Sequence, residues 1–274
     1  MATVAGTFSF KEKRPDLLSG TPRAHAIDRW IFVFMAVWFI VIVLTGFVPD
    51  AIMKVGLVEA GRRPPFPIAM HVHAVLMGSF LLLVLAQSWL MATGRRALHM
   101  QLGIAGMVLA AALVVVGFIL APTMYHQAWN GAHFGPPAGR AALMGALPLI
   151  ENILLLQIAA GLMFALFITI ALLARDRDPG LHKRMVFLAI AVPLAAAIDR
   201  MTWLPTTMPV NPVGQDFYLL LAVAPMFLWD VVRNRRVHEA YWIWFPVFVA
   251  VSTIVDLMWD KPWWHATART IMGV

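Results

Sequence analysis

The chain has 274 residues, of which 61% are hydrophobic and 13% are charged, and its formal net charge is +7. A soluble domain of this size does not have such a composition, whereas a helical membrane protein with several spans does. The absence of cysteine excludes disulfides, thiolate metal ligands, iron–sulfur clusters and a cysteine nucleophile. We find no nucleic-acid-binding motif, and in a membrane protein the basic residues mainly orient the spans.

Seven apolar segments are long enough to cross a bilayer as helices. We predict spans at Trp30–Val48, Ile68–Met91, Leu102–Met124, Leu149–Ala174, Met185–Leu204, Phe217–Val232 and Tyr241–Met258. Membrane strands would need alternating segments of about ten residues, which the sequence lacks. The predicted fold class is therefore all-α, a polytopic membrane bundle of seven transmembrane helices.

The basic residues predict the orientation of these spans. Of the 21 Lys and Arg residues, fourteen lie in the N-terminal tail or in the connections after the second, fourth and sixth spans. Such a bias places the N-terminus in the cytoplasm and the C-terminus outside. We therefore expect a cytoplasmic tail at 1–29, a membrane domain at 30–260 with an irregular, Gly- and Pro-rich external loop at 122–148, and an external tail at 261–274. The expected location is the bacterial inner (cytoplasmic) membrane, with the lipid bilayer as a partner.

Polar side chains gather near the predicted external ends of several spans. They are His71, His73, His126, His133, Glu151 and Asp199. Histidine and carboxylate form the ligand set of zinc, copper and non-haem iron, and neutral imidazole is also an axial haem ligand. The sequence predicts a transition-metal site (copper, iron or zinc) made from these six residues, or haem b with His73 and His126 as cofactor-binding residues. The alternative is a hydrogen-bonded polar layer that fixes helix packing.

Two further groups leave alternatives open. Asp199 and Arg200 point about 100° apart on a helix, which favours ion pairs with different helices over proton relay. His99, His182 and His238 each lie beside basic residues at a cytoplasmic helix end. Three interpretations stay open. The histidines stabilise the helix ends, they bind an anionic headgroup, or His99 and His182 hold a haem between them.

Several motifs carry a family resemblance. They are the paired histidines that open span two, Gln87, GRRALHMQLG, LHKRM, and Asp230 followed by RRVHEAY. From Ile68 to about Trp244 the chain resembles a family of bacterial multi-span membrane proteins of uncharacterised function. It is also distantly similar to the transmembrane di-haem cytochromes, which have helix-end histidines on both sides. The fourth span carries no histidine here, so the regular two-pair arrangement of those cytochromes is not assigned.

Three functions follow from these observations. The first is a metal- or haem-binding membrane protein with a redox role. The second is a non-enzymatic subunit or assembly factor whose partners are other membrane subunits. The third is a proton-coupled transporter, against which the absence of an internal repeat stands. All lysines lie at span ends or in loops, which excludes a retinal Schiff base, and no Walker loop, serine-hydrolase elbow or HExxH motif occurs.

Overall fold

The computed structural model describes residues 16–19 and 25–274. A short 3₁₀ turn, η1, is followed by nine α-helices in the described residues: η1 Leu17–Ser19, α1 Ala26–Glu59, α2 Ile68–Ala92, α3 Arg96–Phe134, α4 Pro137–Ala174, α5 Pro179–Ala191, α6 Leu194–Ile198, α7 Val213–Asn234, α8 Glu239–Met258 and α9 Pro262–Met272. Counting α5 and α6 together, seven described segments are long and apolar enough to cross a membrane. The predicted all-α, seven-span membrane bundle is confirmed, and most of the predicted tail at 1–29 lies outside the described residues.

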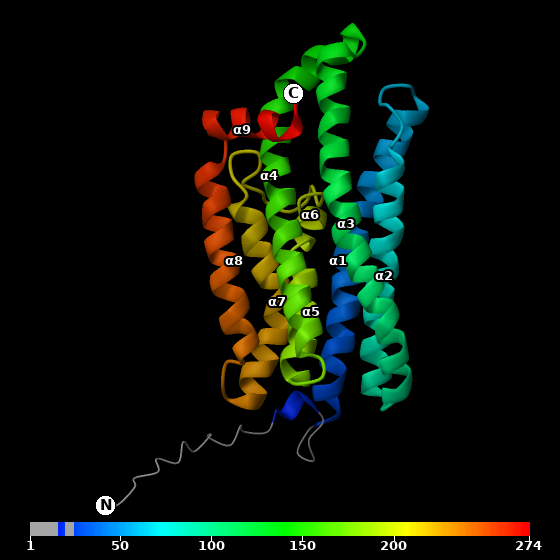
Figure 1. The fold of residues 1–274 in the computed structure, drawn as a ribbon, viewed down its shortest axis with the longest axis vertical. Helices are drawn as coiled ribbons and strands as arrows, with labels where there is room; N and C mark the ends of the chain where they lie inside the picture. The colour runs from blue at the N-terminus through cyan, green and yellow to red at the C-terminus, as the bar shows by residue number, and fades with distance from the viewer. Residues whose placement is uncertain (1–15, 20–24) are drawn as a thin grey trace, which may run out of the picture.

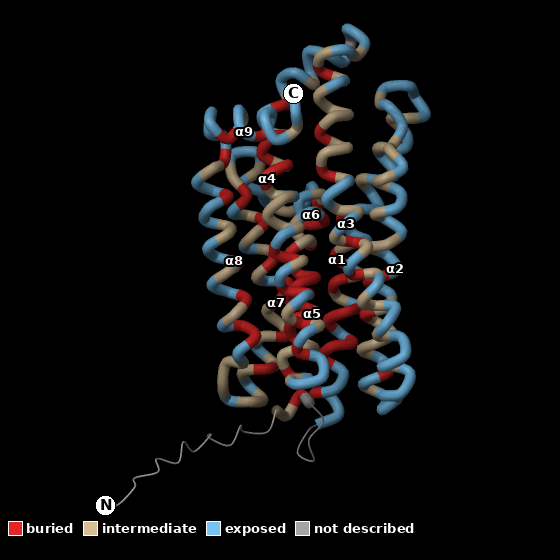
Figure 2. The backbone as a smooth tube through the Cα atoms, in the orientation of Figure 1, coloured by how far each residue is buried: buried red, intermediate tan, exposed pale blue. Residues whose placement is uncertain are grey.

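The spanning helices run side by side, and α9 lies across one end of the bundle (Figure 1). We call the end that carries α9 the outer end, because the charge distribution predicts it to be external, and the opposite end the inner end. The α5–α6 segment is the most enclosed span. Within the most apolar 18-residue stretch of each span, 61% of the residues are buried in α5–α6, compared with 17% in α2 and 17% in α3. Buried residues concentrate along this segment and its neighbours, while the outward faces are exposed (Figure 2). Exposed apolar faces of this kind fit contact with lipid.

The fifth span is interrupted between α5 and α6. Pro193 lies at the break and lacks the N–H that would continue the helical hydrogen bonding. At Gly46, α1 approaches the backbone of Ala197 in α6 so closely that a Cβ atom would lie 2.7 Å from the Ala197 carbonyl carbon. The absence of a side chain at Gly46 therefore sets the packing of α1 on α6.

The expectation of an irregular connection at 122–148 is wrong, because nearly all of it is helical. Helix α3 continues through Pro122 to Phe134, and α4 begins at Pro137 and continues through Pro148. The Gly135–Pro136 pair alone makes the turn. With 39 residues and about 1.5 Å of rise per residue, α3 is much longer than the ~30 Å hydrocarbon core. Gly and Pro residues are typical of turns, and the prediction of an irregular connection rested on them. Helices nevertheless tolerate these residues at their ends and, at some cost, inside.

The predicted external tail at 261–274 contains an ordered helix. One face of α9 is buried through Trp264 and Ala268, whereas Trp263 on another face is 54% exposed. The Trp264 Nε1–H donates to the Glu151 carbonyl oxygen at 3.0 Å, and the backbone N–H of Asp260, just before α9, donates to Asn152 Oδ1 at 3.1 Å. The start of the membrane part of α4 thus holds α9 in place.

Candidate functional site

The two predicted histidines of α2 have different surroundings. His71 is exposed, and its ring packs edge-on against Phe66. His73 is partly buried, and its Nδ1 has no hydrogen-bond partner among the described residues. A buried polar atom without a partner is uncommon in proteins and calls for a ligand, water or ion as an explanation. His73 alone, however, does not make a site.

The two predicted histidines of α3 make contacts with backbone carbonyl groups. His126 lies with Nδ1 2.8 Å from the Pro122 oxygen and Nε2 2.9 Å from the Met272 oxygen. A metal ion at His126 would have to displace one of these contacts. His133 donates from Nδ1 to its own helix at Trp129, 3.0 Å away, and stacks on the Trp129 ring at 4.0 Å between centroids.

Glu151 is fully buried and is the centre of the contacts that hold α9. Its Oε1 accepts from Arg269 Nε at 2.7 Å and from the Tyr125 hydroxyl at 3.4 Å. Its Oε2 lies 2.8 Å from His265 Nδ1. These partners join α3, α4 and α9, so Glu151 ties the last helix to the bundle.

Asp199 and Arg200 pair with different helices, as predicted. Asp199 accepts from Gln215 of α7 at 2.8 Å, whereas Arg200 lies 3.2 Å from Asp50 of α1. The guanidinium of Arg200 also stacks on the Phe47 ring of α1. The Arg200–Asp50 ion pair agrees with the structural interpretation of this dipeptide.

The described residues contain one group of three or more histidine and carboxylate side chains close enough to share a metal ion, and it includes none of the six predicted ligands. Its members are Asp178, His238 and Glu239 at the inner end, with ligand atoms within 4.8 Å of one another. Metal binding by the six outer residues stays a prediction.

The inner group has a competing explanation. His238 is the N-cap of α8, and its Nδ1 accepts a hydrogen bond from the Ala240 N–H at 3.2 Å. A neutral imidazole that accepts at Nδ1 carries its proton on Nε2, which leaves no lone pair there for a metal ion. We therefore assign the group to capping and hydrogen bonding of the helix ends.

Burial and the nearby Arg184 guanidinium lower the pKa of His238 to about 4. Because the unfolded chain binds this proton at its ordinary pKa of 6.5, the folded state loses stability as the pH falls from 6.5 towards 4. We expect a loss of about 1–2 kcal/mol from this residue, since solvent reaches part of the ring. Unfolding measured at several pH values should show a shallower slope in His238→Gln than in the wild-type protein. Equal slopes in this window would contradict the assignment.

An ion network at the inner end lay outside the sequence-based hypotheses. Arg184 of α5 is fully buried, donates to Asp230 Oδ1 from Nη2 at 2.8 Å, and donates to Asp16 from Nη1 and Nη2 at 2.9 and 3.0 Å. Asn234 donates to both carboxylates, and Lys183 lies 3.5 Å from Asp16. The LHKRM and Asp230 motifs contain three of these residues, Lys183, Arg184 and Asp230, but no local signal links them to one another or to Asp16.

The inner end also carries the histidine pair named in the sequence analysis. His182 of α5 donates from Nδ1 to the Ala171 carbonyl oxygen in the last turn of α4 at 2.8 Å. His99 of α3 contacts the Gln87 backbone carbonyl, and its buried Nδ1 has no hydrogen-bond partner among the described residues. The two imidazoles lie within electrostatic reach of each other. Helices α3 and α5 both pack on α4, which brings these residues to one region of the bundle.

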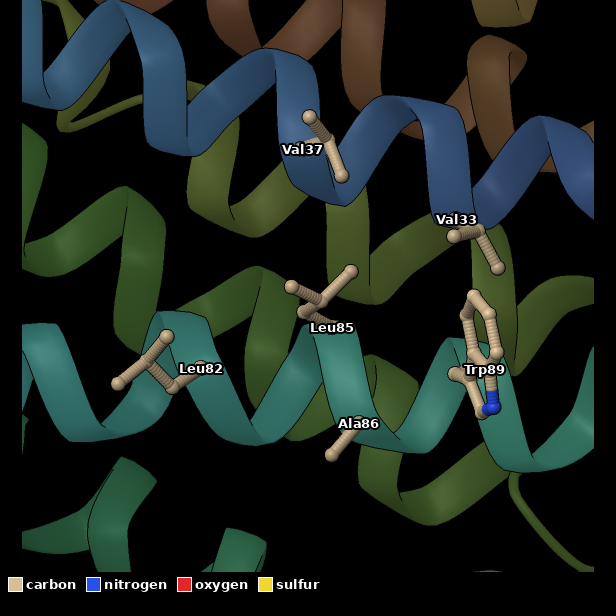
Figure 3. Close-up of a pocket in the computed structure, with 6 residues that line it drawn as sticks. All are labelled: Val33, Val37, Leu82, Leu85, Ala86 and Trp89. Atoms are coloured by element: carbon tan, nitrogen blue, oxygen red, sulfur yellow. The ribbon is translucent and has the colours of Figure 1, made fainter.

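An apolar groove between α1 and α2 has a volume of about 360 Å³. Val33 and Val37 of α1 line one side, and the side chains of α2, with Trp89 facing Val33, line the other (Figure 3). The lining offers no charged group to orient a polar ligand. We therefore assign no chemistry to this groove.

Comparison with family models, with curated proteins and with solved structures gives no match for this chain.

Proposed function

We propose that this multi-pass protein of the bacterial inner membrane binds a b-type haem between His99 and His182 at its inner end. The observation that carries the proposal is the hydrogen bonding of the two imidazole rings. His182 is held by a hydrogen bond from Nδ1 to Ala171, and His99 keeps a buried ring nitrogen without a partner in the described chain. A bound haem supplies one-electron transfer, which gives the protein a role in electron transport.

The hydrogen bonds of the two rings suit axial ligands. A metal-binding histidine usually donates its other ring N–H to a carbonyl or carboxylate, which fixes the tautomer and the orientation of the ring. Since the Ala171 oxygen can only accept, His182 carries its proton on Nδ1 and has a lone pair on Nε2. For His99 the available nitrogen is Nδ1, because it has no hydrogen-bond partner among the described residues and the Gln87 carbonyl oxygen accepts from the other ring nitrogen.

The charges around the pair suit the anionic edge of a haem. Arg96 lies close enough to His99, and Arg175 and Lys183 close enough to His182, to influence those rings electrostatically. Asp176, which pairs with Arg175, is a carboxylate that also lies close to His182. Haem carries two propionates, and guanidinium groups pair well with carboxylates. The inner end, where these arginines lie, is also where a haem held by helix-end histidines would place its polar edge.

The test is an absorption spectrum of the purified protein, oxidised and reduced with dithionite, with elemental analysis of the same sample. The protein should be produced with a haem precursor in the medium, so that supply does not limit loading. We expect a Soret band that shifts on reduction, with iron near one equivalent per chain. His99→Ala and His182→Ala should each abolish or strongly reduce the band.

Variants at the outer histidines are the matched controls, because they remove the same group elsewhere in the bundle. His73→Ala and His126→Ala should retain the full Soret band. If either outer variant loses the cofactor while both inner variants keep it, the haem is bound by the outer histidines instead. The absence of haem from a well-folded sample would overturn the proposal, and near-stoichiometric copper or zinc would replace haem by a metal ion.

A further inference from the structure

A second pocket opens at the outer end, between the end of α6 and the start of α7. It has a volume of about 250 Å³ and is lined partly by Asp199, Thr206 and Gln215. Asp199 and Thr206 are exposed, so the pocket is accessible from outside the bundle. It shares no residue with the proposed haem site.

Gln215 orients the polar side of this pocket. It is only 5% exposed, and its Nε2 donates to Asp199 Oδ1 at 2.8 Å and to Thr206 Oγ1 at 3.3 Å. These bonds fix which way the amide points. Its Oε1 is buried and has no hydrogen-bond partner among the described residues. Gln215 therefore holds the Asp199 carboxylate in place at the wall of the pocket.

The charge of the lining indicates the charge of the ligand. Asp199 is the one charged residue of the lining, and the second oxygen of its carboxylate has no partner among the described residues. The neighbouring cation, Arg200, is engaged by Asp50 and the Phe47 ring. The pocket therefore offers a negative charge and an acceptor oxygen, without a competing cation in its wall.

The remaining lining indicates an organic ligand. Met201 and Leu204 provide apolar surface, and Tyr218 provides an aromatic ring whose hydroxyl donates to the Pro205 carbonyl oxygen. Hard metal ions such as calcium take six to eight oxygen ligands, more than this wall offers. An ammonium group with a short apolar body suits both parts of the pocket, since aromatic faces also attract cations.

We propose that this pocket binds a small primary organic ammonium ion, whose NH₃⁺ group pairs with the Asp199 carboxylate, which Gln215 holds in place, and whose apolar part packs on Met201, Leu204 and Tyr218. The proposal is independent of haem binding, because it concerns the opposite end of the bundle. It adds a ligand site at the outer end to the proposed redox role.

Isothermal titration calorimetry of the full-length protein in detergent tests this proposal, with 2-phenylethylammonium as the probe. The neutral isostere 2-phenylethanol has the same apolar body and no charge. We expect the ammonium ion to bind roughly tenfold or more tightly than the alcohol, because one charge-assisted hydrogen bond contributes about that much. Equal binding of both compounds, or no detectable binding of the ammonium ion up to millimolar concentrations, would overturn the proposal.

The decisive variant is Asp199→Asn, which removes the charge but keeps an oxygen to accept from Gln215. Asp260→Asn makes the same change of net charge at an exposed carboxylate outside the pocket. We expect Asp199→Asn to weaken binding roughly tenfold or more and Asp260→Asn to leave it unchanged. Gln215→Met should also weaken binding. Thermal unfolding shows whether each variant is folded, and equal affinities in a folded Asp199→Asn and in Asp260→Asn would contradict the assignment.

Discussion

Replacing Arg184 with Met is expected to lower the free energy of unfolding by about 3–5 kcal/mol, the usual cost of removing one partner of a buried ion pair. Arg184 and Asp230 are both fully buried, and the substitution leaves the charge of Asp230 without its two hydrogen bonds from the guanidinium. It also removes both bonds to Asp16. Equilibrium unfolding in mixed detergent micelles would measure the change.

Two further variants separate charge from packing. Arg175→Met removes an arginine whose pair with Asp176 is exposed, and we expect a change of about 0.5 kcal/mol or less. Adding Asp230→Leu to Arg184→Met removes the stranded carboxylate and should recover part of the lost stability. If Arg184→Met is no more harmful than Arg175→Met, the network does not stabilise the fold.

Replacing Gly46 with Ala is the second large expected effect. The added Cβ would overlap the Ala197 carbonyl oxygen and lie 2.7 Å from its carbon, and these are backbone atoms that cannot rotate away. Overpacking of this kind costs about 1–3 kcal/mol, and more where backbone must move. We expect a loss in the upper part of that range, measured by the same unfolding method.

Gly56→Ala is the matched control on the same helix, because nothing lies within 4 Å of the position of its added Cβ. Alanine in place of glycine inside a helix stabilises by about 0.5–1 kcal/mol. The two substitutions should therefore change stability in opposite directions. Similar effects at both positions would show that α1 does not pack on α6 at Gly46.

The length and hydrophobicity of each segment were sufficient to predict the helical bundle. Each span is an apolar run of membrane length, and such a run has to be helical in lipid, whatever its neighbours are. The prediction of an irregular connection at 122–148 is wrong, because the stretch around Ala141 is helical despite the turn-forming residues before it. In the structure only Gly135 and Pro136 interrupt the helices.

Contacts between distant residues could not be predicted in this way. The sequence marked His99 and His182 as helix-end histidines, but the bond from His182 to Ala171 depends on how α5 packs on α4. The sequence predicts His126 as a site residue near the outer end, but its contact with Met272 joins residues 146 positions apart. No periodicity in one sequence carries such information.

The ion pairs at the inner end have a consequence for the biosynthesis of the protein. Asp28 at the start of α1 lies 2.8 Å from Arg233 at the end of α7, a residue that leaves the ribosome 205 positions later. At a synthesis rate of about 5–20 residues per second, Arg233 is made about 10–40 s after Asp28. Asp16 is likewise made before its partner Arg184. Until α7 has been synthesised, the ion pairs that join α1 to α7 at the inner end are therefore missing. A nascent chain that is truncated before α7 would expose these acidic residues to membrane quality-control proteases.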